Sequence, residues 1–299
     1  MKSRAILLLT AFIWGFAFVA QRQGMESVPP FTFNAIRFLI GCVSLVPFAL
    51  MQQRRVSHTP TPTRRILWLG GIATGLVLFT AASLQQIGMV ETAAGKAGFI
   101  TGLYVVIVPL MGLARGHRAG FWIWAGAVAS VVGLYLLTVT ETLTIERGDL
   151  FVLASAFFLA LHVQMIDRFS ARLGAIRLSI IQFGVVVICS FIVALGFETA
   201  TLAGLRAGLG AILYTGLLSV GVAYTLQVVG QRDTPPAQAA IILSLETVFA
   251  VLGGWLLLGE SLPARGLLGC GLMFGGTLAS QLGGVFSWKR IRRSRSTPA

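Results

Sequence analysis

Long hydrophobic segments, separated by short polar connections, run through the whole 299-residue chain. Each segment is close to the ~20 residues that an α-helix needs to cross the hydrocarbon core of a bilayer. The pattern therefore predicts an all-α, polytopic membrane protein with ten transmembrane helices. The predicted spans are residues 5–22, 31–51, 66–88, 92–114, 119–139, 150–168, 176–197, 207–230, 235–258 and 263–285.

One predicted span carries an acidic side chain inside an otherwise apolar stretch. The stretch is Thr234–Glu260, and the acidic residue within it is Glu246. A carboxylate near the middle of the bilayer costs about 2.5 kcal/mol or more on insertion scales, so it must face protein or water rather than lipid. Glu246 is therefore the first candidate for a functional site.

The two halves of the chain resemble each other. With a shift of 142 positions, Leu84–Phe99 aligns with Leu226–Ile241 and shares identical glutamine, glycine and threonine residues with it. A unit of five spans that is copied in tandem reverses its orientation in the membrane, because five is an odd number. The sequence therefore predicts two inverted five-helix repeats, at residues 1–140 and 150–286, and a basic cytoplasmic tail at 287–299.

Composition and charge exclude a soluble protein. The chain is 56% hydrophobic and only 11% charged, which is too apolar for a soluble globule of this size. Its net charge of +13 suggests a nucleic-acid partner only if the basic residues form a binding face. Instead, 17 of the 23 Lys and Arg residues fall on one side of the membrane when the connections are assigned to alternate sides. The positive-inside rule then places both termini in the cytoplasm, and we expect no nucleic-acid partner.

The sequence contains none of the motifs that carry catalysis. It has no paired carboxylates, no histidine metal motif, no nucleophile elbow and no phosphate-binding loop. The three cysteines lie in apolar runs without a ligand at metal-binding spacing, so we interpret them as small hydrophobic residues. We therefore expect no enzyme activity, no catalytic residue, no metal and no cofactor.

Small residues at a spacing of four, such as Gly271 and Gly275, let helix backbones approach closely. Packing within a monomer is the favoured interpretation, and a dimer interface is the alternative. The glycine-rich last span also predicts tight packing of spans five and ten. The expected partners of the chain are the lipid bilayer and a small-molecule substrate.

Few side chains within the spans can bind a polar cargo. A zwitterion needs polar partners at the membrane midplane, where Glu246 and its repeat mate Tyr104 are expected at similar depth. Aromatic side chains such as Trp14 add the apolar lining that small-molecule sites favour. The full set of candidates for the cavity and for substrate binding is Glu246, Tyr104, Trp14, Gln85, Thr101, Phe99, Tyr224, Gln227, Lys96, His162 and Arg37.

Each charged candidate also has a purely structural interpretation. Glu246 could be locked to Arg37 or to a helix end and stabilise the fold. Arg37 is long enough to snorkel to the membrane interface instead of binding cargo. Lys96 could bind a carboxylate or cap the outer vestibule. His162 could relay protons, but a hydrogen-bonded core histidine is the simpler interpretation.

One segment points to a known family. Leu245–Gly276 resembles the signature of EamA-type proteins in the drug/metabolite transporter superfamily. Trp14 followed by Gly15, and the run Ala35–Phe38 at the opening of span two, support the resemblance. The family often has a proline where Thr247 stands here, which leaves a break in span nine open.

The resemblance implies a function as well as a ten-helix plan. It implies a secondary transporter in the inner membrane of a bacterium that exports small metabolites by alternating access through a central cavity. Exporters of amino acids, aromatic ones among them, belong to the family, so amino acids are the leading cargo class. The alternatives are a multidrug or lipophilic-cation exporter of the same superfamily and a membrane scaffold that transports nothing.

Overall fold

The protein is helical throughout the part of the chain that the structure describes. The computed structural model describes residues 2–55, 63–92, 94–116, 119–138, 146–258 and 264–294. Helices follow one another with short connections, and no strand occurs among these residues. The prediction of an all-α protein is confirmed. The basic tail beyond residue 294 and the linker at 56–62 lie outside the described residues.

The described residues of the first half form eight helical elements. They are α1 (Lys2–Met25), α2 (Pro30–Arg55), α3 (Arg64–Ile66), the π-helix η1 (Leu67–Ile72), α4 (Ala73–Glu91), α5 (Ala94–Gly102), α6 (Tyr104–Ala114) and α7 (Phe121–Thr138). The second half begins with α8 (Arg147–Leu173) and continues with α9 (Ala175–Phe197), α10 (Leu202–Ala207), α11 (Leu209–Tyr214), the π-helix η2 (Thr215–Tyr224), α12 (Thr225–Gln231), α13 (Pro236–Leu243), α14 (Glu246–Leu258) and α15 (Ala264–Ser294).

The helices have the length and composition of membrane spans. Within the described residues, eight stretches are long and apolar enough to cross a membrane, and Phe121–Leu137 is a shorter apolar helix. Large apolar side chains such as Ile188 and Leu195 cover the outside, whereas Gln86 and Gln182 are completely buried. A soluble protein has the opposite arrangement. The multi-pass membrane prediction is confirmed, while the count of ten spans and the cytoplasmic termini stay predictions.

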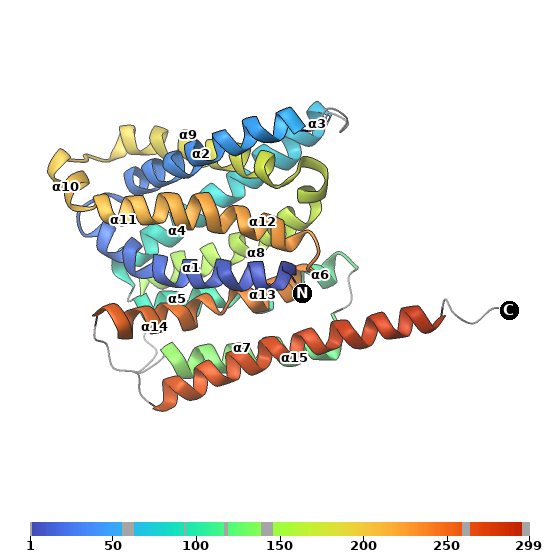
Figure 1. Cartoon of the computed structure of the whole chain (residues 1–299). Helices are drawn as coiled ribbons and strands as arrows, with labels where there is room; N and C mark the ends of the chain where they lie inside the picture. Colours follow the sequence, from blue (N-terminus) through green and yellow to red (C-terminus); the bar gives the residue numbers. More distant parts are fainter. Residues whose placement is uncertain are drawn as a thin grey trace.

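Helices of one half pack mainly against helices of the other half. α4 packs on α8, and in the same way η2 and α12 pack on α1. α9 packs on α4, as η2 packs on α2. Figure 1 shows α7 and α15 side by side at one edge of the bundle. If each helix is replaced by its counterpart in the other half, the α4–α8 and α4–α9 pairs become the pairs that η2 and α12 form with α1 and that η2 forms with α2, and the α7–α15 pair stays the same. This agrees with an architecture of two repeats.

Spans four and nine are both interrupted by a tight turn. α5 gives way to α6 at Leu103, and α13 gives way to α14 at Ser244 and Leu245. Leu103 and Ser244 have nearly the same backbone angles, with φ of −60° and −61° and ψ of −15° in both. The amides of Leu103 and Leu245 each donate to the carbonyl three residues earlier, at 3.2 Å. This is 3₁₀ geometry, so span nine is broken even though Thr247 replaces the proline of the family.

Glycines bring α7 and α15 into backbone contact. A Cβ atom on Gly133 would lie 2.6 Å from the carbonyl oxygen of Gly269, and one on Gly276 would lie 2.7 Å from that of Gly126. Neither position can accept a side chain without moving a helix backbone. The tight packing expected for spans five and ten is present, and it depends on these glycines.

We expect Gly133→Ala and Gly276→Ala to destabilise the protein, because each new methyl group meets a backbone carbonyl. Overpacking of this kind costs about 1–3 kcal/mol. The matched control is Gly275→Ala on the same helix, where a Cβ atom meets nothing within 4 Å. Thermal unfolding of the purified variants in detergent measures the difference. Equal midpoints for all three variants would contradict this account of the α7–α15 contact.

Candidate functional site

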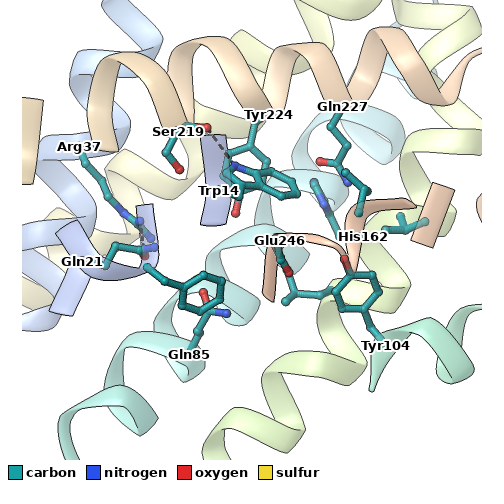
Figure 2. A pocket seen from close by; sticks show the side chains of 14 residues that line it. Trp14, Gln21, Arg37, Gln85, Tyr104, His162, Ser219, Tyr224, Gln227 and Glu246 are labelled. Atoms are coloured by element: carbon teal, nitrogen blue, oxygen red, sulfur yellow. Dashed lines mark hydrogen bonds between the residues drawn. The ribbon is translucent and has the colours of Figure 1, made fainter. Parts of the chain in front are cut away.

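A cavity lies in the centre of the bundle. It is bounded by α1, α2, α4, α6, α8, η2, α12, α13 and α14. These elements belong to the predicted spans one, three, four, six, eight and nine, with α2 in addition. Figure 2 shows polar and aromatic side chains from both halves of the chain pointing into it.

The structure brings most of the predicted site residues together around this cavity. Those that line it are Trp14, Arg37, Gln85, Tyr104, His162, Tyr224, Gln227 and Glu246. Thr101 lies one layer behind the lining, where it accepts a hydrogen bond from the Gln85 amide nitrogen at 3.3 Å. The side chain of Lys96 lies outside the described residues.

Phe99 does not line the cavity. Its ring packs against Tyr135 of α7, with 6.4 Å between the ring centroids. Phe99 shares a helix face with Gly102, which is three residues later and touches Leu134 of α7. This face of α5 is therefore turned toward α7 and away from the cavity.

Glu246 and Tyr104 meet at the centre of the bundle. They are the first residues after the breaks in spans nine and four, and they are 6% and 3% exposed. The Tyr104 hydroxyl lies beside the Glu246 carboxyl group, but it is not aligned as a hydrogen bond and has no hydrogen-bond partner among the described residues. The two repeat-related positions therefore bring two chemically different side chains to one cavity, and their similar depth in the membrane stays a prediction.

Arg37 is held inside the bundle by neutral partners. Its Nε donates to Asn34 Oδ1 at 2.9 Å, and its Nη1 donates to Gln21 Oε1 at 2.5 Å. Its guanidinium lies over the Phe38 ring, 5.1 Å from the centroid. The residue is only 2% exposed, so Arg37 does not snorkel to the surface. The amide oxygen of Gln21 accepts a hydrogen bond from Arg37 but, being neutral, does not compensate the positive charge of the guanidinium.

The two buried charges of the cavity are not paired with each other. Neither Arg37 nor Glu246 makes an ion pair in the described part of the chain, so the interpretation of Glu246 as locked to Arg37 is wrong. Figure 2 shows Arg37 at one end of the cavity, Tyr104 and Gln227 at the other end, and Glu246 between them. The cavity therefore has a guanidinium group at one end and a carboxyl group in its middle.

An aromatic pair forms one wall of the cavity. The rings of Trp14 and Tyr224 meet edge to face, with 4.7 Å between their centroids. Trp14 Nε1 donates to the backbone carbonyl of Ser219 at 3.2 Å (Figure 2). Ser219 and Tyr224 both belong to the π-helix η2, whose wider turns change which carbonyls and side chains face the cavity. The pair thus fixes the position of α1 against η2.

His162 has the hydrogen bond and the burial of a core histidine, and its role as a proton relay stays a prediction. One ring nitrogen lies 2.9 Å from the Gln182 amide oxygen, within hydrogen-bond distance, and the residue is buried. The same ring lines the cavity, near the Tyr224 ring. His162 is thus a hydrogen-bonded core histidine that also borders the cavity.

Sequence reasoning missed several lining residues. They are Phe18, Gln21, Leu159, Val163, Ser219 and Leu243. The sequence does contain a signal for Phe18 and Gln21, because they follow Trp14 at the spacing that places all three on one face of a helix. The three aliphatic residues carry no signal in the sequence that separates a cavity wall from ordinary packing.

The cavity is closed on the side where α1 begins. An apolar cluster on α1, α6, α8 and α13 fills this side, formed by Leu7, Tyr104, Val108, Ala160, Val163, Ala239, Ala240, Ile242 and Leu243. Beyond the cluster, Ser3 Oγ donates to Asp233 Oδ2 at 3.0 Å and ties the start of α1 to the end of α12. Polar lining from Gln21, Arg37 and Gln85 lies toward the opposite side.

The comparisons with known proteins agree with this architecture. The EamA-like transporter family matches residues 2–139 and again residues 146–280. An uncharacterized transporter of Archaeoglobus fulgidus is 30% identical over 257 residues, which cover 86% of this chain and 78% of that protein. The uncharacterized inner membrane transporter YedA of Escherichia coli K12 is 26% identical over 87% of this chain and 84% of its own length.

A solved crystal structure shares the fold. It superimposes with a TM-score of 0.77 at 18% sequence identity, and the match covers 94% of this chain and 96% of that one. The double family match falls on the two halves whose helices pack against each other in corresponding pairs. The chain belongs to the EamA-like transporter family and is a multi-pass membrane transporter.

Proposed function

We propose that the protein exports small zwitterionic metabolites of the amino-acid class across a bacterial inner membrane. One observation carries the proposal. The central cavity contains one carboxylate, from Glu246, and one guanidinium, from Arg37, and the two are not paired with each other. An amino acid carries one ammonium and one carboxylate, so a single cargo molecule can provide a counter-charge for both residues.

The energetics of buried charge support this assignment. A charge in a low-dielectric interior is costly unless it is paired and hydrogen-bonded. Arg37 has hydrogen bonds from neutral partners but no counter-charge among the described residues. Glu246 likewise has no cationic neighbour there. Cargo that carries both charges offsets both costs, which makes its binding favourable at a site that excludes most water.

The packing supports transport by alternating access. The cavity is sealed by the apolar cluster around Leu7, and its polar side lies toward the other face. α1 packs with η2, α12 and α14, whereas α8 packs with α4, α5 and α6. A tilt of these two groups against each other can open one face while it closes the other. The breaks at Leu103 and Ser244 provide the points where spans four and nine can bend.

A lipophilic-cation exporter remains the second candidate, and the aromatic wall favours it. Trp14 and Tyr224 lie beside Glu246, an arrangement that attracts organic cations by both charge and ring face. Arg37 in the same cavity disfavours it, because a guanidinium repels a second cation. A scaffold without transport is disfavoured by the cavity itself and by membership in a transporter family.

The cargo class is tested with purified protein in proteoliposomes. We expect uptake of a labelled amino acid such as phenylalanine to be inhibited by unlabelled phenylalanine, and much less by phenylethylamine or phenylpropionate, which each lack one of the two charges. Transport of tetraphenylphosphonium without transport of amino acids would establish the second candidate. Absence of both fluxes would favour the scaffold.

We expect Arg37→Met to weaken amino-acid binding by roughly tenfold or more, since a charge-assisted hydrogen bond contributes about 1.5–3 kcal/mol. Inhibition by phenylethylamine should change much less, because this amine has no carboxylate. The matched control is Arg22→Met on α1, since Arg22 is exposed. Equal loss for the amino acid and the amine would contradict a carboxylate contact at Arg37.

We also expect a proton and the cargo ammonium to compete for Glu246. Each can neutralise its buried carboxylate, so an inward proton gradient should accelerate export. In Glu246→Gln this acceleration should disappear, whereas the exposed control Glu26→Gln should keep it. Efflux from proteoliposomes with and without an imposed pH gradient measures the effect. Wild-type amino-acid flux that ignores the gradient would show uncoupled passage instead.

A further inference from the structure

Two buried side chains in the cavity carry oxygen atoms without a hydrogen-bond partner. They are Tyr104 Oη and Gln227 Oε1, unpaired among the described residues, on side chains only 3% and 2% exposed. Buried polar atoms in folded proteins are almost always paired. The exceptions in a cavity therefore mark places where a bound molecule completes the hydrogen bonding.

Both oxygens belong to one end of the cavity, and the Glu246 carboxyl group lies between them and the Arg37 end. Tyr104 comes from α6, Gln227 from α12 and Glu246 from α14, so three separate helices contribute. Figure 2 shows Tyr104 and Gln227 at the end away from Arg37, with Glu246 between the two ends. Each of the three groups can accept a hydrogen bond.

We propose that Glu246, Gln227 and Tyr104 form a subsite for a primary ammonium group, and that this subsite selects primary amines over tertiary and quaternary ones. A primary ammonium has three N–H donors and one positive charge, which match three acceptors and one carboxylate. This inference rests on the proposed function and specifies how its cargo is recognised.

Hydrogen bonding, rather than charge, provides the selectivity. A quaternary ammonium can satisfy the charge of Glu246 and stack on Trp14 and Tyr224, but it has no N–H to donate. It would leave the oxygens of Gln227 and Tyr104 buried and unpaired. Sites built to hydrogen-bond a ligand group reject analogues that lack it for this reason.

The repeat mate of Gln227 shows that the subsite is asymmetric. Gln85 occupies the equivalent position in the first half and also lines the cavity, but its amide nitrogen is used in a hydrogen bond to Thr101. Gln85 is therefore anchored to Thr101 and only partly buried, whereas the oxygen of Gln227 is buried without a partner among the described residues. This difference makes Gln85 a matched control for Gln227.

The first test is an N-methylation series. Phenylalanine, its N-methyl and N,N-dimethyl derivatives and its N,N,N-trimethyl betaine compete with labelled phenylalanine in proteoliposomes. We expect inhibition to weaken along the series, with a difference of at least about tenfold between phenylalanine and the betaine, as the loss of hydrogen bonds to buried acceptors implies. Equal inhibition by phenylalanine and the betaine would overturn the proposal.

The second test assigns the selectivity to residues. In Gln227→Leu and in Tyr104→Phe, the ratio between the inhibition constants of the betaine and phenylalanine should fall toward one. In Gln85→Leu the ratio should stay at its wild-type value, even if transport slows. Thermal unfolding shows that each variant is folded. A wild-type ratio in both Gln227→Leu and Tyr104→Phe would contradict the subsite.

The experiments distinguish a failure of the proposed function from a failure of the ammonium subsite. If phenylalanine and other amino acids are not transported at all, the proposed function is wrong and the ammonium subsite falls with it. If phenylalanine is transported and the betaine inhibits equally well, only the subsite is wrong. In that case Glu246 recognises charge alone.

Discussion

The cost of placing charge inside a membrane controls this structure. Glu246 and Arg37 are buried near the centre of an apolar bundle, and neither has an ionic partner in the described residues. Such charges are tolerated only where protein or water surrounds them. The helices must therefore enclose a polar cavity instead of a continuous apolar core, and the two broken spans, the aromatic wall and the buried glutamines are all arranged around it.

The two halves of the chain share one backbone plan, and the different residues at matching positions determine the chemistry of the cavity. The breaks at Leu103 and Ser244 have the same backbone geometry, and after its break each repeat delivers a side chain to the central cavity. The first half delivers Tyr104 there, and the second half delivers Glu246. Two equivalent backbones thus present a neutral phenol and a carboxyl group to one cavity, which a strictly symmetric pair of repeats could not provide.

Hydrophobic pattern alone predicted the fold class, because the cost of unpaired backbone groups in lipid leaves few alternatives to spanning helices. The internal repeat predicted that Tyr104 and Glu246 would lie at similar depth, and both line the central cavity. The depth of Arg37 was not predictable, because its inward position depends on Gln21 from another helix. The orientation of Phe99 depends on how α5 is rotated against α7, and the π-helix that presents Ser219 has no sequence signature of its own.

The separation of the two charges follows from what a transporter has to do with its empty site. If Arg37 and Glu246 formed an ion pair, the cargo would have to break that pair before it could bind, and its own charges would only replace a contact already made. Asn34 and Gln21 accept hydrogen bonds from Arg37. Because both are neutral, they do not compensate its positive charge. If the cargo is a zwitterion, as we propose, its two charges stabilise this cavity more than water does. A ligand shifts a conformational equilibrium only by such differential stabilisation.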